Sequence, residues 1–388
     1  MITICSEGLF PDSIFSFKRM YSFLYNNKDS VPPNMLPKLF GELTCLRALS
    51  ISKGWQYNES LIKDIPKEVG KLIHLRYLNL RGSRMIKLPE ALCELYNLQT
   101  LDITRCDQLE ELPQGMEKLI NLRHLQNYGT WSLRYMPIGI QRLSNLRTLS
   151  NFVVSDGNDE KACSLEGLKY LNLYGKLYIG MLGNVSSGEK VKKSEIKNQK
   201  SLFGLTLDFE KNVDGRERRN EEDEALLDIL QPSLNLEKLN ILTYRGNSNL
   251  PNWMMSLTKL RHLTLNCCSN YKHLPPLGEL PSLEHLDINF MNGLKSVSNE
   301  FLRKETDGTS SCSVFFPKLK RIIFWWLSEW EEWDYNVTRV GEEDITIMPS
   351  LIFLNIENCP KLKTLPKQLV QNNELEKSIY GCPLLGYP

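Results

Sequence analysis

Aliphatic side chains recur along this chain as a triplet with the spacing Leu-x-x-Leu-x-Leu, and mostly polar residues fill the positions between them. In the first half the triplet begins at Leu75, Leu98, Leu122 and Leu146, which are 23, 24 and 24 residues apart. Further copies begin at Leu46, Leu202, Leu236, Leu260, Leu283, Leu319 and Leu351. This order fits neither a helix of period 3.6 nor a simply alternating strand, so it indicates an internal repeat.

A period of about 20 to 29 residues with this triplet is the signature of a leucine-rich repeat. The end of each triplet predicts a short strand whose two aliphatic side chains point inward while the residue between them points outward. Successive strands then stack in parallel, and each forms backbone hydrogen bonds with the next coil. The sequence therefore predicts an α/β leucine-rich-repeat solenoid, a horseshoe with a parallel β-sheet on its concave face and irregular turns and short helices on its convex face.

A Leu-Pro dipeptide, or a close variant of it, follows the strand in several coils. Proline fixes φ and lacks an N–H group, so it suits a turn that has no ladder partner, and we expect these prolines on the convex side. The dipeptides stand at 88–89, 112–113, 136–137, 250–251, 274–275 and 365–366. Between strand and proline, the position inside the turn is assigned to Cys106, to Cys267 or Cys268, and to Cys359, because cysteine is small enough to fit there.

The regularity of the repeat divides the chain into three sections. Residues 1–151 carry regular N-terminal repeats, residues 152–235 carry irregular repeats with a polar helix and a charged loop, and residues 236–388 carry regular C-terminal repeats. The irregular features that we expect are a loop at 156–161, a polar helix at 187–200, a charged loop at 208–228 that runs into a helix, and insertions at 303–313 and 328–345.

Composition and charge narrow the classes of partner. The chain has 388 residues with 47 basic and 46 acidic side chains, so its net charge gives no argument for nucleic acid or a membrane surface as partner. No apolar run approaches the roughly 20 residues of a membrane-spanning helix, and the N-terminus does not look like a secretion signal. The ten cysteines form no Cys-x-x-Cys pair, which favours free thiols in a reducing compartment and a cytoplasmic location. Asn58, Asn184 and Asn336 begin glycosylation sequons, which matter only in a secreted chain.

Several blocks of the sequence resemble one family in particular. The runs LYGKLYIGMLGNV at 173–185, LQPSLNLEKLNI at 230–241 and LPNWM at 250–254 are similar to segments of plant nucleotide-binding leucine-rich-repeat immune receptors of the coiled-coil class. The run LPPLGELPSLEHLDI at 274–288 and the run GCPLL at 381–385 also resemble that family, and all the blocks keep its order. The chain is therefore similar to the leucine-rich-repeat region of plant NB-LRR disease resistance proteins.

The resemblance implies a function. Such receptors carry a coiled-coil domain and a nucleotide-binding (NB-ARC) switch before their repeats, and this chain has neither. It contains no GxxxxGK[ST] phosphate cradle, since Gly70-Lys71 and Gly175-Lys176 are each followed by leucine, so we expect no nucleotide exchange and no cofactor. The resemblance implies the recognition half alone, a protein–protein interaction domain that recognises pathogen effectors or a guarded host protein and restrains the switch in cis or in trans.

Other functions stay open at this stage. The missing switch favours a stand-alone leucine-rich-repeat scaffold or adaptor in signalling or ubiquitination, although no F-box-like segment precedes the repeats. A cell-surface ectodomain is disfavoured by the lack of a signal, a spanning helix and paired-cysteine caps. No HExxH, GxSxG or Cys/His arrangement is seen, so an enzyme is the least favoured class. The N-terminus also lacks a polar cap, which predicts that the isolated chain aggregates.

The outward positions of the predicted strands form a candidate protein-binding face. One repeat position holds Arg47, Arg76, Arg123, Arg147 and Arg261, a basic stripe that either attracts an acidic partner or pairs with nearby carboxylates. In the family the N-terminal repeats hold the switch inactive, and the resemblance gives this role to the arginines from 47 to 147. The candidate residues of the concave face are Arg76, Tyr77, Arg81, Arg105, Arg123, His124, Tyr128, Arg147, Arg261, His262, His285, Trp325 and Trp326.

An aromatic run near the C-terminal end has two possible roles. Trp325 and Trp326 stand with Phe324, Trp330 and Trp333 either in an exposed interface or in a core that the longer coil covers. By register Phe324 points inward and Trp325 points outward, so at least one tryptophan of the run should be exposed.

Two histidines occupy equivalent positions in adjacent coils. The rings of His262 and His285 are expected about 5 Å apart across the sheet. Glu284 and Asp287 are nearby, but ligands spread over exposed strands without supporting side chains rarely bind a metal, so we predict no metal site.

Overall fold

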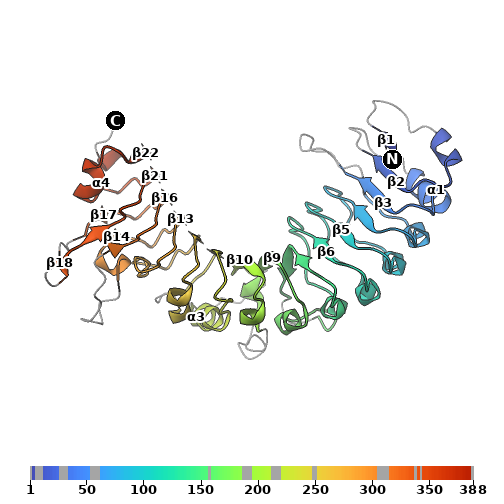
Figure 1. The fold of residues 1–388 in the computed structure, drawn as a ribbon, viewed down its shortest axis with the longest axis horizontal. Helices are drawn as coiled ribbons and strands as arrows, with labels where there is room; N and C mark the ends of the chain where they lie inside the picture. The colour runs from blue at the N-terminus through green and yellow to red at the C-terminus, as the bar shows by residue number, and fades with distance from the viewer. Residues whose placement is uncertain are drawn as a thin grey trace. The chain divides into compact units, whose positions relative to one another are not determined.

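The computed structural model describes residues 2–4, 12–25, 34–52, 62–155, 159–185, 195–210, 220–246, 251–303, 314–335, 339–340 and 343–385. The chain divides into two compact units, the first formed by residues 1–179 with 184–195 and the second by residues 180–183 with 196–388. Within each unit the strands lie along one side of successive coils and the short helices lie along the other side (Figure 1). The irregular middle section predicted at 152–235 falls partly in each unit.

The first unit carries a parallel sheet whose strands follow the order of the chain. The triplet leucines are in register, so that Leu78 lies between Leu49 and Leu101, and Leu125 follows Leu101. The strands of this sheet are β1 (Ile2–Ile4), β2 (Ser22–Tyr25), β3 (Ala48–Ile51), β4 (Tyr77–Asn79), β5 (Thr100–Asp102), β6 (His124–Gln126) and β7 (Thr148–Leu149). The strands β8 (Asn151–Val153) and β9 (Gly175–Gly180) follow in the chain but do not belong to this sheet. Each repeat of the sequence therefore contributes one strand to the sheet, and equivalent residues of successive repeats lie side by side.

The second unit repeats this arrangement with longer strands. Leu239, Leu263, Leu286, Ile322 and Leu354 form one continuous row across it. The strands are β10 (Leu202–Asp208), β11 (Lys238–Leu242), β12 (His262–Asn266), β13 (His285–Asn289), β16 (Arg321–Trp325), β21 (Phe353–Glu357) and β22 (Glu376–Tyr380). The leucine-rich-repeat solenoid predicted from the triplets is confirmed.

Shorter strands and helices complete the coils. Outside the main sheets, β14 (Ser296–Val297) pairs with β17 (Glu332–Trp333), β15 (Val314–Phe315) with β20 (Thr346–Ile347), and β18 (Arg339–Val340) with β19 (Glu343–Asp344). The α-helices are α1 (Met35–Glu42), α3 (Asn220–Ile229) and α4 (Lys367–Gln371). The 3-10 helices are η1 (Asp12–Ser16), η2 (Lys67–Lys71), η3 (Glu90–Glu94), η4 (Gln114–Lys118), η5 (Ile138–Arg142), η6 (Leu165–Tyr170), η7 (Leu182–Asn184), η8 (Ile196–Asn198), η9 (Asn252–Ser256), η10 (Asn299–Phe301) and η11 (Pro383–Leu385).

Prolines start many of the helices on the side away from the sheet. Pro89, Pro113, Pro137 and Pro251 directly precede η3, η4, η5 and η9, with φ between −58° and −70°. Proline is prearranged for this position because its ring fixes φ and the first helical turn needs no N–H donor from it. The prolines at 89, 113, 137 and 251 therefore lie where the sequence predicts them, and Pro366 likewise precedes α4.

The core consists of the inward triplet side chains and the cysteines of the turns. Leu75, Leu78 and Leu80 are fully buried, and burying each such side chain contributes about 1.5 to 3 kcal/mol. Cys268 is buried and Cys267 is exposed, so Cys268 is the residue inside the turn. Its thiol, like those of the other turn cysteines, points at backbone carbonyls, with 3.8 Å between Cys268 Sγ and the Ile241 oxygen.

Several predictions fall wholly or partly outside the described residues. They are the loop at 156–161, the polar helix at 187–200, the charged loop at 208–228, the insertions at 303–313 and 328–345, and the sequons at Asn58 and Asn336. Where these segments are described, η8 is a single 3-10 turn within the expected polar helix, and α3 is the helix expected after the charged loop.

Candidate protein-binding face

The outward side chains of the strands form what we call the sheet face of each unit. In β12, half-buried His262, Thr264 and Asn266 alternate with buried Leu263 and Leu265, as the period of two requires. The predicted candidates that are exposed are Arg76, Tyr77, Arg105, Arg123, Tyr128, Arg147, Arg261, Trp325 and Trp326, and those that are half-buried are Arg81, His124, His262 and His285. All of them are accessible to a partner to some degree.

The residues that directly precede strands β3 to β7 form a column that crosses the coils, which we call the arginine column. Its members are Arg47, Arg76, Gln99, Arg123 and Arg147. Each backbone N–H donates to the carbonyl oxygen of the preceding member, at 2.7 Å for Arg76 on Arg47 and 2.8 Å for Arg147 on Arg123. The four arginines are exposed, and neighbouring members are about 4.8 Å apart, the spacing of parallel strands.

The positive charge of the arginine column is not balanced on the sheet face. Within the described part of the chain, no ion pair joins a column arginine to a carboxylate, and Arg47 instead lies 4.8 Å above the Tyr21 ring. The carboxylate of Glu94 in η3 lies on the helix side and pairs with Lys118 at 3.0 Å. Asp102 does stand on the sheet face, but it is 6% exposed and accepts a backbone hydrogen bond. The first sheet face is therefore cationic.

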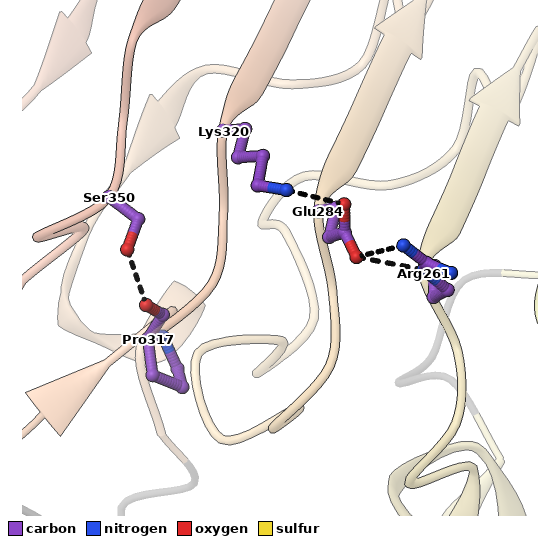
Figure 2. Close-up of polar contacts among 5 residues, drawn as sticks. All are labelled: Arg261, Glu284, Pro317, Lys320 and Ser350. Carbon is purple, nitrogen blue, oxygen red and sulfur yellow. Dashed lines mark hydrogen bonds and ion pairs between the residues drawn. The ribbon is translucent and has the colours of Figure 1, made fainter.

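The equivalent column of the second unit alternates in charge, and we call it the alternating column. Its members Glu237, Arg261, Glu284 and Lys320 are linked by the same backbone hydrogen bonds, at 2.8 to 2.9 Å. Figure 2 shows the Glu284 carboxylate between its neighbours, accepting from Arg261 Nε at 2.8 Å and from Lys320 Nζ at 2.9 Å. These hydrogen bonds, led by that from Lys320, lower the pKa of Glu284. Arg261, the member of the predicted basic stripe in the second unit, is thus paired with an acidic residue. Among the stripe arginines that the structure describes, only those of the first unit lack an ion pair.

The aromatic run at 324–333 divides between the core and the sheet face. Trp330 and Trp333 are fully buried, with ring centroids 4.6 and 5.0 Å from that of Phe324. Trp325 and Trp326 are 37% and 50% exposed. Phe324 therefore points inward and Trp325 outward, as the register predicts, and the interface hypothesis narrows to the two exposed tryptophans.

Phe290 completes an exposed aromatic patch with these tryptophans, and the sequence did not single it out. Its ring lies 4.8 Å from Trp325 and 6.1 Å from Trp326. Phe290 and Trp326 each directly follow a strand and have left-handed backbones, with φ of 53° and 57°. The signal that could have identified Phe290 is its place after the strand, which Trp326 shares one coil further on.

A second aromatic group lies in the first unit. Tyr128, a predicted candidate, packs edge-on against Trp131 at 5.5 Å and Tyr178 at 6.5 Å. Trp131 is 56% exposed. Sequence reasoning missed Trp131 because it stands in a turn, and it missed Tyr178 because its coil departs from the triplet.

The two histidines of the second sheet face stack on each other. The ring centroids of His262 and His285 are 4.4 Å apart and the planes differ by 11°, close to the predicted separation. Burial lowers the pKa of His262, and the nearby cationic groups of His285, Lys238 and Arg261 lower it further. Among the described residues no group of three or more His, Cys, Asp or Glu side chains is placed to hold a metal ion. Nor does any described helix have the length and apolar character to cross a membrane.

Comparison with known proteins gives consistent relatives. The family described as "Leucine-rich repeat region" matches residues 65–333. The putative disease resistance RPP13-like protein 1 of Arabidopsis thaliana is 40% identical over 364 residues, which cover 90% of this chain and 32% of that protein. Disease resistance protein RGA2 of Solanum bulbocastanum is 34% identical over 321 residues, which cover 75% of this chain and 31% of that protein. The chain therefore spans less than a third of the length of these relatives.

A solved structure supports the fold independently. The leucine-rich-repeat protein LIC12759 of Leptospira interrogans aligns with 96% of this chain and 87% of its own chain, with a TM-score of 0.50 and 19% sequence identity. At that identity the likeness concerns the fold alone.

Proposed function

Because this chain belongs to the leucine-rich repeat family and matches plant disease resistance proteins, as its sequence predicted, we propose that it is the recognition domain of a cytoplasmic immune receptor. In this proposal its sheet faces bind proteins. One ligand is a pathogen effector or a guarded host protein, and the other is the NB-ARC switch domain of the receptor. The chain itself carries out no catalysis.

The arginine column is the observation that carries this proposal. Four exposed guanidinium groups, with no ion pair among the described residues, favour a partner surface that supplies carboxylates. The alternating column offers no such attraction because Arg261 and Lys320 already share Glu284. We therefore assign the switch domain to the first sheet face.

The exposed aromatic patch of the second unit supports the other half of the proposal. Exposed tryptophans are enriched among the residues that dominate binding energy at protein interfaces. Trp325, Trp326 and Phe290 stand together on the face where Arg261 and Lys320 pair with Glu284. We assign the effector or the guarded host protein to this face.

Binding and release are coupled by differential affinity. A ligand that binds the released receptor more tightly than the restrained one shifts the population toward release. Each tenfold preference corresponds to about 1.4 kcal/mol. Several exposed ion pairs, each of them weak, can together hold the switch domain with a binding free energy of this size.

Charge reversal in the arginine column tests the assignment. The variant Arg123→Glu with Arg147→Glu should bind an NB-ARC domain from a plant disease resistance protein at least tenfold more weakly than the unchanged chain, measured by pull-down and by titration at two salt concentrations. The control, Lys118→Glu with Arg142→Glu, makes the same change in net charge on the helix side and should bind normally. Unchanged binding by the first variant, or an equal loss in the control, removes the assignment.

A further inference from the structure

Two cysteines follow the strands of adjacent coils at equivalent positions. Cys359 comes two residues after β21 ends at Glu357, and Cys382 comes two residues after β22 ends at Tyr380. They are 0% and 7% exposed, and both are free thiols. The turn cysteines Cys106 and Cys268 differ from this pair, because the described residues place no second cysteine one coil away from either of them.

The register of the strands sets the distance between Cys359 and Cys382. Glu357 pairs directly with Tyr380, and the ladder continues where the Asn358 N–H donates to the Tyr380 oxygen at 2.9 Å. Neighbouring strands lie about 4.8 Å apart, so the two cysteine Cα atoms, each two residues past that pair, are separated by roughly this spacing. Disulfides join Cα atoms about 4.4 to 6.8 Å apart, so the backbone need move little to form one.

The two thiols have equivalent backbone surroundings, since Cys359 Sγ donates to the Glu357 oxygen at 3.6 Å and Cys382 Sγ donates to the Tyr380 oxygen at 3.4 Å. The neighbouring Cys359 thiol lowers the pKa of Cys382. By contrast, burial raises the pKa of Cys106 and of Cys268 to about 12. Since the thiolate is the reactive form, we take Cys382 as the attacking thiol of the pair.

The coil that carries Cys382 packs less tightly than the coil before it. Lys377 stands opposite Leu354 in the register, so a lysine takes the inward position that leucine fills in the preceding coil, and its Nζ donates to the Val370 oxygen at 2.7 Å. Ile379 is only half-buried, whereas Ile356 opposite it is fully buried. Few buried apolar contacts lower the free energy of local opening, so β22 can open and give a small molecule access to Cys382.

We propose that Cys359 and Cys382 form a redox modification site that closes to a disulfide by reaction with a small-molecule disulfide such as oxidised glutathione. The Cys382 thiolate attacks one sulfur of that molecule, which breaks its S–S bond, forms a mixed disulfide and releases one small thiolate that takes up a proton. The Cys359 thiol then gives up its proton to solvent and attacks Cys382 Sγ, which releases the second small thiol. Two electrons pass from the two cysteines to the oxidised molecule.

Closing the disulfide fixes the coil of β22 to that of β21. Tyr380, which is 72% exposed, continues the row of Trp325 and Glu357 on the second sheet face. The oxidised chain therefore extends this face by one firmly held strand, while a reducing compartment keeps the pair as thiols and lets β22 open. The effect on the strand does not depend on which protein the face binds.

The test uses the full chain in glutathione buffers of increasing oxidised fraction, followed by alkylation and peptide mass mapping. We expect a peptide pair joined through Cys359 and Cys382, while Cys106 and Cys268 remain open to alkylation after unfolding. Amide hydrogen exchange across 376–380 should slow at least tenfold on oxidation. In Cys359→Ser, and in Cys359→Ala as a second variant, Cys382 should carry only glutathione and exchange should not slow. Cys268→Ser should keep the full response.

Three results would overturn the proposal. One is that both cysteines stay open to alkylation in buffers that convert dithiothreitol to its disulfide. Another is that unchanged chain accumulates glutathione on Cys382 without the cross-link. The third is that the cross-link forms but leaves exchange across 376–380 unchanged, which would refute the tightening of β22.

Discussion

The residue before each strand lies in the same place in both units, yet its charge differs. In the first unit this column carries four exposed arginines, whereas in the second Glu237, Arg261, Glu284 and Lys320 alternate in sign. Backbone hydrogen bonds of 2.7 to 2.9 Å hold both columns, so the geometry is shared and only the side chains differ. The repeat therefore fixes where a side chain stands and leaves its chemistry free, which lets one fold present surfaces for different partners.

This comparison requires that residues of the sheet face contribute much less to stability than residues of the core. The tryptophans provide the strongest test of that difference. Trp330→Ala should lower the free energy of unfolding by about 3 to 5 kcal/mol, because it leaves a cavity beside Phe324. Trp326→Ala should lower it by less than about 1 kcal/mol, because that side chain is 50% exposed. Urea unfolding followed by circular dichroism measures both. Equal losses would show that Trp326 belongs to the core and not to a binding face.

Removing an acidic member of the alternating column should have a smaller effect on the free energy of unfolding than the loss of Trp330. Glu284→Gln removes the negative charge between Arg261 and Lys320 and should lower the free energy of unfolding by about 1 kcal/mol at pH 7, since such pairs contribute roughly 0.2 to 1 kcal/mol each. The pKa of Glu284 is lowered in the folded chain. Its contribution is therefore complete above the ordinary pKa of about 4.5 and is lost as the pH falls through the folded pKa.

Urea unfolding at pH 7 and at pH 3 separates this effect from a general loss of packing. Glu94→Gln serves as the control, because it breaks one exposed pair with Lys118 in the first unit. It should change stability by clearly less than Glu284→Gln does, because both partners are exposed to solvent. If Glu284→Gln lowers stability equally at both pH values, the carboxylate does not act through its charge.

Much of the architecture was predictable because the triplet period alone decides which side chains point inward. The shared position of Arg76, Arg123 and Arg261, the stacking of His262 on His285, and the inward direction of Phe324 all follow from that period. The helix-starting prolines were predictable for a related reason, since their ring restricts the backbone wherever they stand.

Contacts that depend on the length and path of the turns were not predictable. Glu284 and Lys320 hold equivalent positions of successive triplets 36 residues apart, but the triplet does not report that their side chains form an ion pair. The exposure of Trp326 follows from a left-handed backbone at the end of its strand, a conformation that the sequence does not mark with glycine. Asn127 is fully buried where other coils carry an aliphatic residue, because its amide exchanges hydrogen bonds of 2.7 and 2.9 Å with the Asn151 backbone.

The smallest expected effect concerns the first residue of the strands, where the two units differ again. His124 in the first unit has Thr148 beside it, 3.0 Å from Nδ1 to Oγ1, whereas His262 in the second has a second histidine. Because burial and the neighbouring cationic groups lower the pKa of His262, its NMR titration midpoint should lie below the ordinary value of about 6.5. The unfolded chain then takes up the proton first, so stability falls as the pH drops from about 6.5 toward the folded pKa.

Replacing the neighbour sharpens this last prediction. His285→Gln removes one of the positive charges that face His262 and should move the His262 midpoint upward, toward 6.5, by a few tenths of a unit. His262→Gln should reduce the loss of stability between pH 7 and pH 5 by a fraction of a kcal/mol, as measured by urea unfolding at the two pH values. A His262 midpoint at or above 6.5 in the unchanged chain would mean that the stacked, half-buried arrangement does not persist in solution. In that case the second sheet face would carry more positive charge near neutral pH, and the contrast between the two units would weaken.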